Sequence, residues 1–341
     1  MPRNWKKIDD SPKADQEKSI PQSATPEMER LETFDARQPQ RCLEDLIVSE
    51  SIMTQIQTTL NRIRHHDTLY NTWNLKKIDP HGRRTAINFF GPPGTGKTFC
   101  AEAIAHHLGK SIITVNYAEI ESKYVGETPK NITAAFKKAK ETDAVLFFDE
   151  ADSILGKRLT NVTQSADHGV NVSRSVMLLQ LDDFDGVVIF ASNLPENYDG
   201  AFVRRILAHI EFELPDQICR ERLWNYLLPA EVPKSPDITM EWLADQSEGL
   251  AGGDILNAVK LAASQAVARS GGRCQVFQDD FLAAIAQVRR GKEKVGNVSV
   301  QKTPPVIKET ILSPDELSPE LRDRYEESVS QLSVNNSQSA T

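Results

Sequence analysis

The run GPPGTGKT, residues 91–98, constrains the fold of this chain more than any other feature of the sequence. Its spacing is G-x-x-x-x-G-K-[ST], and it lies between the β-rich run TAINFF (85–90) and the helical run KTFCAEAIAHHL (97–108). Gly94 and Gly96 allow the backbone to curl around a phosphate, and the start of the helix presents partial positive charge to it. A strand, a phosphate loop and a helix in this order predict an α/β fold with a nucleoside triphosphate site.

Four further β-rich runs alternate with helical segments: SIITVN (111–116), AVLFFDE (144–150), GVVIFAS (186–192) and HIEFEL (209–214). Continuous apolar strands separated by helices predict a parallel sheet that helices cover on both faces. The strand pattern ends at Pro215, and the apolar spacing after it predicts several helices. We therefore expect a nucleotide-binding α/β domain at 41–215 and a small all-helical subdomain at 216–290.

The two ends of the chain, residues 1–40 and 291–341, are polar and charged with few large apolar side chains. Such segments do not repay the entropy of ordering, so we expect both ends to be mostly disordered or flexible. The formal net charge of −8 argues against a nucleic-acid partner. The four cysteines form no CxxC pair, and no apolar run is long enough to span a membrane, so a cytoplasmic protein is expected.

The phosphate loop and one strand end supply the groups that nucleotide hydrolysis needs. Lys97 is expected to bridge the β- and γ-phosphates, and the Thr98 hydroxyl to ligate Mg²⁺. Asp149 and Glu150 follow a buried strand, where Asp149 is expected to hold the metal and Glu150 to activate water. Acids in this place are alternatively plain helix-start residues. The loop residues expected to surround the phosphates are Gly91, Pro92, Pro93, Gly94, Thr95 and Gly96.

Further motifs follow in a fixed order: SKYVGE (122–127), FFDEAD (147–152), SNLPEN (192–197), GAFVRRI (200–206) and GLAGGDI (249–255). Over about residues 41–290 the chain resembles the classical AAA clade of the AAA+ ATPases, which includes katanin, spastin and the AAA module of FtsH-type proteases. The resemblance implies Mg²⁺-dependent hydrolysis of ATP. No H-E-x-x-H motif follows residue 255, so the protease activity of the FtsH branch is not encoded here.

The resemblance implies roles for several residues outside the phosphate loop. Asn193 corresponds to the sensor that orients the attacking water or the γ-phosphate, although an asparagine before Leu-Pro is also a common turn residue. Arg204 and Arg205 correspond to arginine fingers that reach the nucleotide of the next subunit, although paired arginines are often a solvated helix face. Fingers that act in trans imply a homo-oligomeric ring, in this family usually a hexamer.

The residues that correspond to the family's adenine contacts match its motifs less closely than the phosphate loop does. Gly252 and Gly253 correspond to the small residues that approach adenine, and they also suit the start of a capped helix. Ile47 is expected to contact the base, but the segment around it reads EDLIVSES instead of the family's D-I-G-G.

Lys123, Tyr124, Val125 and Gly126 correspond to the family's pore loop, which grips an extended polypeptide. An aromatic ring offers large apolar contact without demanding a particular sequence, although Tyr124 alternatively packs under its own loop. The leading interpretation is a ring ATPase that remodels or unfolds protein substrates. The alternatives are an ATP-dependent switch or assembly scaffold and, disfavoured by the charge, a DNA-directed clamp loader or helicase.

Overall fold

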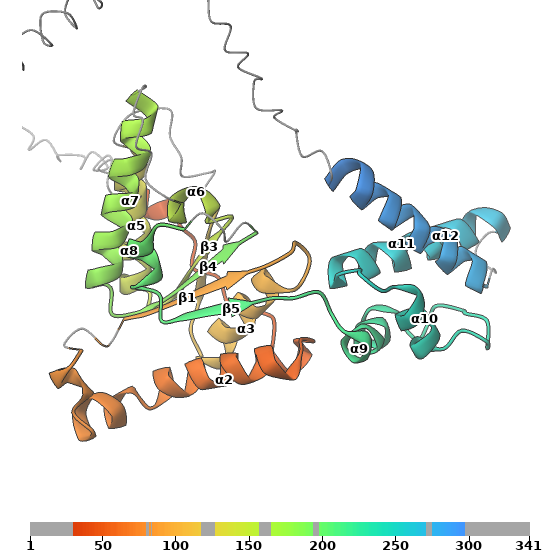
Figure 1. The fold of residues 1–341 in the computed structure, drawn as a ribbon, viewed down its shortest axis with the longest axis horizontal. Coiled ribbons are helices and arrows are strands. Elements are labelled where there is room, and N and C mark those ends of the chain that lie inside the picture. The colour runs from red at the N-terminus through yellow and green to blue at the C-terminus, as the bar shows by residue number, and fades with distance from the viewer. Residues whose placement is uncertain are drawn as a thin grey trace, which may run out of the picture. The chain divides into compact units, whose positions relative to one another are not determined.

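A five-stranded parallel sheet forms the centre of the structure, a computed structural model that describes residues 30–79, 82, 84–116, 127–156, 165–193, 198–270 and 275–296. The strand order is β2-β3-β4-β1-β5 (Figure 1), and every neighbouring pair is parallel. The strands are β1 (Thr85–Phe90), β2 (Ile112–Asn116), β3 (Val145–Asp149), β4 (Val187–Ser192) and β5 (Ala208–Glu211). The predicted fold class is confirmed.

The last strand is shorter than the sequence pattern predicts. β5 pairs with β1 as far as Glu211 opposite Phe90, and Phe212 N–H donates one more hydrogen bond to Phe90 O at 2.7 Å. β1 then turns into the phosphate loop at Gly91. The residues after Phe212 have no neighbouring strand to pair with, so they leave the sheet despite their apolar alternation.

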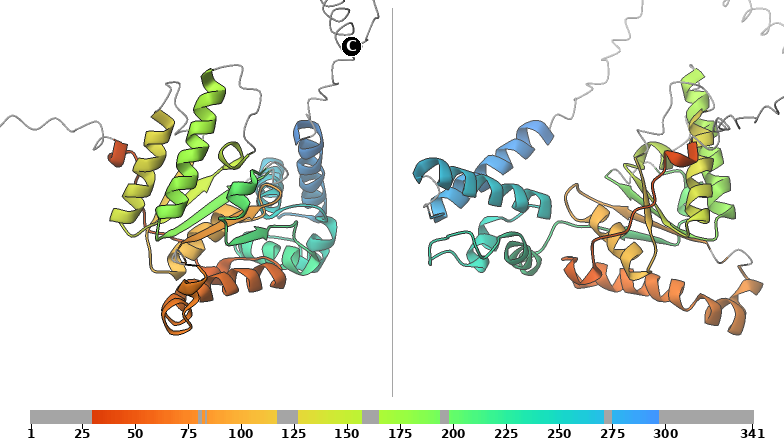
Figure 2. Two further views of the ribbon diagram at one scale, coloured as in Figure 1. Left: turned by 60° about the vertical axis from the view of Figure 1, so that its left-hand side comes forward. Right: turned by 180° about the vertical axis from the view of Figure 1, so that it is seen from behind.

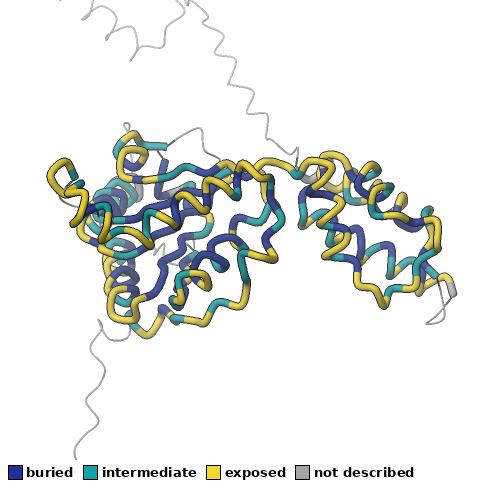
Figure 3. The backbone as a smooth tube through the Cα atoms, turned by 90° about the horizontal axis from the view of Figure 1, so that it is seen from below, coloured by how far each residue is buried: buried dark blue, intermediate teal, exposed yellow. Residues whose placement is uncertain are grey.

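Helices cover both faces of the sheet, as Figures 1 and 2 show. α2 (Glu50–Arg64) and α3 (Lys97–His107) pack on one face; α5 (Glu127–Glu141), α6 (Asp152–Leu155), α7 (Ser165–Asp183) and α8 (Gly200–Val203) pack on the other. Successive strand residues point to opposite faces, so Ile87 and Phe89 join the first core and Ala86 the second. The inner strands β1, β3 and β4 are accordingly buried along almost their whole length, whereas in the edge strand β5 only Ile210 is buried. Figure 3 shows the buried and exposed stretches along the backbone.

The covering helices carry their apolar residues at helical spacing. In α2, Ile52, Ile56 and Leu60 are buried on one face, and the Ser49 hydroxyl caps the helix by accepting from Ile52 N–H. In α5 the predicted inward face is confirmed, since Ile132, Ala135, Phe136 and Ala139 are all buried. Short helical turns at Leu43–Asp45, Thr68–Thr72 and Leu75–Lys77 connect the elements on either side of α2.

Within the described residues, four helices follow the sheet: α9 (Gln217–Leu227), α10 (Met240–Gln246), α11 (Gly252–Ser270) and α12 (Gln278–Gly291), the last leading into the turn Lys292–Gly296. They enclose a core of their own, in which the rings of Trp224 and Phe281 meet edge to face at 5.7 Å. The Trp224 indole N–H donates to the buried Ser247 hydroxyl at 2.9 Å. No helix in the described ranges is long and apolar enough to cross a membrane.

Residues 30–40 are ordered against the sheet, so the expectation of disorder is wrong for this part of the N-terminal segment. Phe34 is 6% exposed within the second core, and Arg37 exchanges two backbone hydrogen bonds with Ile112 on the edge strand β2. A few well-placed apolar residues anchor a segment that is polar on average. Residues 1–29 and 297–341 lie outside the described part of the chain.

Candidate nucleotide site

The phosphate loop links β1 to α3 and depends on its glycines. Gly91, Gly94 and Gly96 all have positive φ angles, of 130°, 76° and 104°, which favour glycine. A Cβ atom on Gly91 would lie 2.3 Å from the carbonyl oxygen of Phe212. The loop is therefore held so close to the chain that leaves β5 that a side chain at Gly91 is excluded, whereas at Gly94 and Gly96 the positive φ alone disfavours one.

Lys97 is the buried cation at the centre of the site. Its ammonium group donates to Gly91 O at 2.7 Å, Pro92 O at 2.9 Å and the side-chain oxygen of Asn193 at 2.8 Å. Burial lowers the pKa of Lys97, while the carboxylates of Asp149 and Asp152 act in the opposite direction. Two backbone carbonyls and the side chain of the predicted sensor Asn193 thus hold the charge inside the loop.

The end of β3 supplies the two acids that the sequence predicts. The Thr98 hydroxyl donates to Asp149 Oδ2 at 3.1 Å, so the two proposed metal ligands lie together. Glu150 is exposed and has a φ of 53°, an uncommon conformation for a residue other than glycine. Its backbone N–H donates to Asp149 Oδ1 at 2.9 Å. The Glu150 side chain is thus exposed to solvent directly after Asp149.

Asp152 belongs to the same group of residues, although sequence reasoning did not identify it. Its carboxylate accepts hydrogen bonds from the Ser192 hydroxyl and, at 3.4 Å, from the backbone N–H of Asn193. It therefore fixes the start of the segment that carries Asn193. The sequence signal that could have identified Asp152 is its position in the motif FFDEAD, two residues after Glu150.

A cavity of about 300 Å³ lies next to the phosphate loop. The predicted adenine residues Ile47, Gly252 and Gly253 line it, and Gly253 N–H donates to Gly94 O at 3.1 Å. Loop residues Gly94, Thr95 and Gly96 reach the same cavity, whereas Gly91, Pro92, Pro93, Lys97 and Thr98 are not among its lining residues. A cavity of this size fits a small organic ligand. Lining residues that sequence reasoning missed include Asp216, Leu223, Tyr226 and Leu256.

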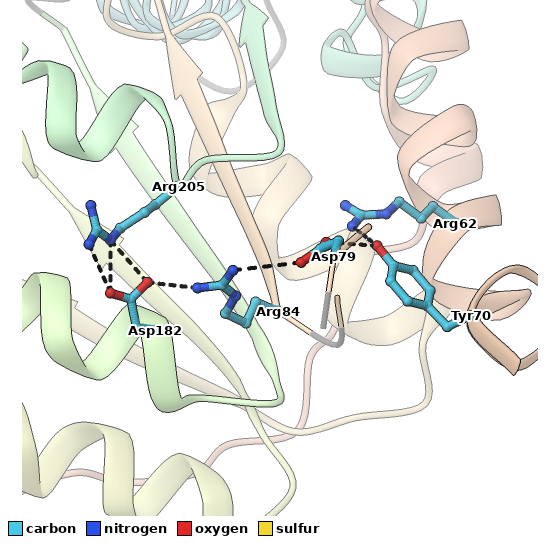
Figure 4. Close-up of polar contacts among 6 residues, drawn as sticks. All are labelled: Arg62, Tyr70, Asp79, Arg84, Asp182 and Arg205. Carbon is cyan, nitrogen blue, oxygen red and sulfur yellow. Dashed lines mark hydrogen bonds and ion pairs between the residues drawn. The ribbon is translucent and has the colours of Figure 1, made fainter. Parts of the chain in front are cut away.

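Arg204 and Arg205 follow α8 and differ in their contacts, of which Figure 4 draws those of Arg205. Arg205 donates to Asp182 through Nε at 3.0 and 3.1 Å and through Nη2 at 2.8 Å, and Asp182 also accepts from Arg84 at 2.7 Å. Arg204 is exposed, and its side chain has no hydrogen bond or ion pair within the described ranges, although its backbone N–H donates to Gly200 O at 3.3 Å. The two predicted fingers are therefore not equivalent, because Asp182 binds the side chain of Arg205 and not that of Arg204.

The contacts of Arg84 extend this arrangement to the turns before β1, as Figure 4 shows. Arg84 lies 3.8 Å from Asp79, which accepts a hydrogen bond from the hydroxyl of Tyr70 at 3.0 Å. Arg62 on α2 donates to the same hydroxyl at 2.8 Å. Arg205 is thereby connected to the end of α2 through charged and polar side chains.

The predicted pore-loop residues Lys123, Tyr124, Val125 and Gly126 lie outside the described residues. The description resumes at Glu127, the first residue of α5. The Glu127 carboxylate accepts from Arg30 at 2.9 Å, which lowers the pKa of Glu127. The N-terminal segment is thus attached directly after the predicted pore loop.

Comparison with known proteins agrees with this geometry. A family model described as ATPase family associated with various cellular activities (AAA) matches residues 87–214. The chain is 33% identical over 223 residues to the 26S proteasome subunit RPT4 of Saccharomyces cerevisiae, covering 63% of this chain and 50% of that protein.

Two further relatives are likewise similar to this chain over only part of their length. Proteasome-activating nucleotidase of Methanopyrus kandleri is 32% identical over 215 residues, covering 61% of this chain and 48% of that protein. Katanin p60 ATPase-containing subunit A1 of Strongylocentrotus purpuratus is 35% identical over 191 residues, covering 52% of this chain and 36% of that protein. The chain thus spans about half the length of the proteasome relatives or less. The phosphate loop, Asp149 at the end of β3, Glu150 directly after it and Asn193 all fall inside residues 87–214, the region that matches the AAA family of ATPases.

Proposed function

We propose that this chain hydrolyses ATP in a ring of identical subunits and uses the energy to remodel or unfold protein substrates. The observation that carries the catalytic part is the convergence of Lys97, Asn193, Thr98 and Asp149 at the carboxyl ends of β1, β3 and β4. Ligands of open α/β sheets bind at this edge, and the four side chains are those that phosphoryl transfer requires.

The residues present fit a nucleotide with its metal ion. The glycine backbone of the loop leaves room for phosphate oxygens, and Lys97 supplies a positive charge for the β- and γ-phosphates. Thr98 and Asp149 already contact each other through oxygen atoms, which suit Mg²⁺ as ligands. Bound there, Mg²⁺ would neutralise charge that develops on the phosphate oxygens. The base of ATP would occupy the cavity beside Ile47 and Gly253.

In this site Glu150 acts as the general base. Its exposed carboxylate takes a proton from water as the water oxygen attacks the γ-phosphorus and the bond to the β,γ-bridging oxygen breaks. Asn193 orients the water or the γ-phosphate, and Lys97 stabilises the charge on the transferred group. The products are ADP and inorganic phosphate.

The oligomeric and substrate parts of the proposal rest on other observations. Arg204 is exposed without a partner in the described ranges, as expected of a finger for a neighbouring subunit. Head-to-tail contacts of this kind close into rings, and we propose a hexamer. Two relatives bear names that assign them to the proteasome, which supports a protein substrate. The KYVG sequence at 123–126 supplies the aromatic side chain that would grip it.

Turnover measured with different polymers tests this proposal. ATP hydrolysis by the full chain is measured alone, with an unfolded polypeptide and with single-stranded DNA, and the mass of the assembly is measured for Glu150→Gln with ATP. We expect stimulation by polypeptide only and a nucleotide-dependent oligomer. Stimulation by DNA only, or a Glu150→Gln protein that stays monomeric with ATP at every concentration, contradicts the proposal.

A further inference from the structure

Three charged residues from distant parts of the sequence meet where β1 begins. β1 lies between β4 and β5, and Leu207 N–H, directly before β5, donates to Ala86 O at 2.8 Å. The segments that enter these three parallel strands therefore lie side by side. They carry Arg84 before β1, Asp182 near the end of α7, and Arg205 between α8 and β5.

The Asp182 carboxylate is shared by two guanidinium groups. Its Oδ1 accepts from Arg84 Nη1 at 2.7 Å and from Arg205 Nε at 3.0 Å, and its Oδ2 accepts from Arg205 Nη2 at 2.8 Å. Arg84 also lies 3.8 Å from Asp79, so positive and negative groups alternate along this series (Figure 4). The four side chains are only 29–40% exposed, and networks of this kind fix side-chain geometry better than isolated surface pairs.

Arg205 is held in one orientation but keeps donors for a further ligand. A guanidinium group has five N–H groups. The bonds to Asp182 use Nε–H and one N–H of Nη2, and Ala201 O accepts one N–H of Nη1 at 3.1 Å. Within the described part of the chain, one N–H on each Nη atom remains without a partner. Two such donors on one edge suit a pair of phosphate oxygens.

This group lies far from the phosphate loop of its own subunit. The loop begins at Gly91, after the carboxyl end of β1, whereas Arg84 precedes the amino end of the same strand. Six strand residues separate the two ends, a length of roughly 20 Å. Arg205, bound beside Arg84 through Asp182, is therefore placed to act on the nucleotide of another subunit and not on its own.

We propose that Arg84 is a positioning residue for ATP hydrolysis in the neighbouring subunit, where it orients Arg205 through Asp182. Arg84 itself contacts no nucleotide; it fixes the carboxylate that binds Arg205. A donor that is oriented before the subunits meet loses less freedom at the γ-phosphate and stabilises the transition state more. This inference rests on the proposed role of Arg205 as a finger in trans.

Steady-state ATP turnover by the assembled protein tests this role. Arg84→Met keeps the apolar part of the side chain and removes the guanidinium group. We expect kcat to fall about 3- to 10-fold, with KM for ATP changed less than about twofold, because the phosphate loop is intact. Arg84→Lys keeps one charged donor group and should recover part of the loss. In an Arg205→Ala background, Arg84→Met should lower kcat no further, and a further loss would overturn the inference.

Mixed oligomers separate a positioning role in trans from a structural role within the subunit. Arg84→Met subunits have an intact phosphate loop, and Lys97→Ala subunits supply an intact Arg205 to it. Wild-type subunits mixed with Lys97→Ala in the same ratio are the reference. We expect the loss caused by Arg84→Met to be smaller in the mixture than in the pure oligomer. An equal loss in both would place the defect in the subunit's own site and overturn the inference.

Arg269→Met is the matched control. Arg269 also donates to a carboxylate, that of Asp280, at 2.6 and 3.0 Å, but it belongs to the C-terminal helices. We expect this substitution to lower the melting temperature and leave kcat unchanged. The same pattern in Arg84→Met would mean that Arg84 only stabilises the fold, and the inference would be wrong.

The inference and the proposed function fail in different measurements. Arg205→Ala subunits are mixed with Lys97→Ala subunits in the same way. Absence of any recovery in proven mixed assemblies contradicts the action of Arg205 in trans, which belongs to the proposed function. Recovery for Arg205→Ala without recovery for Arg84→Met overturns only the role of Arg84.

Discussion

The ammonium group of Lys97 lies 2.8 Å from the side-chain oxygen of Asn193, although the two residues belong to different motifs. The contact follows from the order of the strands. β1 and β4 are parallel neighbours, with Phe90 opposite Ser192, so the segments that leave both strands meet at one edge. The residues that we propose as phosphate contact and sensor, Lys97 and Asn193, are thereby brought into direct contact.

Lys97→Ala and Glu150→Gln should separate binding from chemistry at this site. Lys97→Ala removes the charged partner of the phosphates, so we expect most nucleotide binding to disappear. Glu150→Gln keeps the loop and should bind ATP without turning it over. Binding of a labelled ATP analogue and phosphate release are the two measurements, with exposed Glu141→Gln on α5 as control. Near wild-type turnover by Glu150→Gln would show that another group is the base.

Gly91→Ala should destabilise the loop by a clash and not by backbone strain alone. The added Cβ would meet the carbonyl oxygen of Phe212 at 2.3 Å. Gly109→Ala is the control, since Gly109 also has a positive φ, of 66°, but no atom within 4 Å of an added Cβ. Strain alone costs about 1–3 kcal/mol. In urea unfolding, Gly91→Ala should lower the free energy of unfolding more than Gly109→Ala does, and it should also weaken nucleotide binding. Equal decreases in the two variants would contradict the clash.

Much of this site was predictable because its motifs are local. Lys97, Thr98 and Asp149 were identified from a loop and a strand end, and the structure places all three together. Asp152 and Asp182 were missed, because their importance lies in partners distant in sequence, Ser192 for one and Arg84 and Arg205 for the other. Such contacts depend on the order of the strands in the sheet, and that order cannot be derived from hydrophobic periodicity.

The N-terminal segment illustrates the same limit. Average polarity predicts disorder for residues 1–40, yet Phe34 is buried and Arg37 pairs with Ile112. We expect Phe34→Ala to lower the free energy of unfolding by about 3–5 kcal/mol, the usual loss for a buried phenylalanine. Phe277→Ala, where the ring is 45% exposed, is the control and should lose much less. If Phe34→Ala and Phe277→Ala lowered the free energy of unfolding equally in chemical denaturation, Phe34 would not contribute to core packing.

The two arginines after α8 should respond differently to substitution. Arg204→Ala removes an exposed side chain, so turnover should fall on the order of 10³-fold with no change in melting temperature. Arg205→Ala also leaves Asp182 with fewer partners, so it should lower both turnover and stability. Oligomers mixed from Arg204→Ala and Lys97→Ala subunits should recover partial activity. Absence of recovery in proven mixed assemblies would argue against action in trans.

Polypeptide stimulation of ATP hydrolysis in Tyr124→Ala tests the central proposal most directly. Tyr124 lies outside the phosphate loop, so nucleotide binding, assembly and basal turnover should be kept, while stimulation by an unfolded polypeptide should be lost. Tyr124→Phe and Tyr124→Trp keep the apolar contact area and should stay partly active. Undiminished polypeptide stimulation and substrate unfolding by Tyr124→Ala would contradict threading past Tyr124 and favour an ATP-dependent switch.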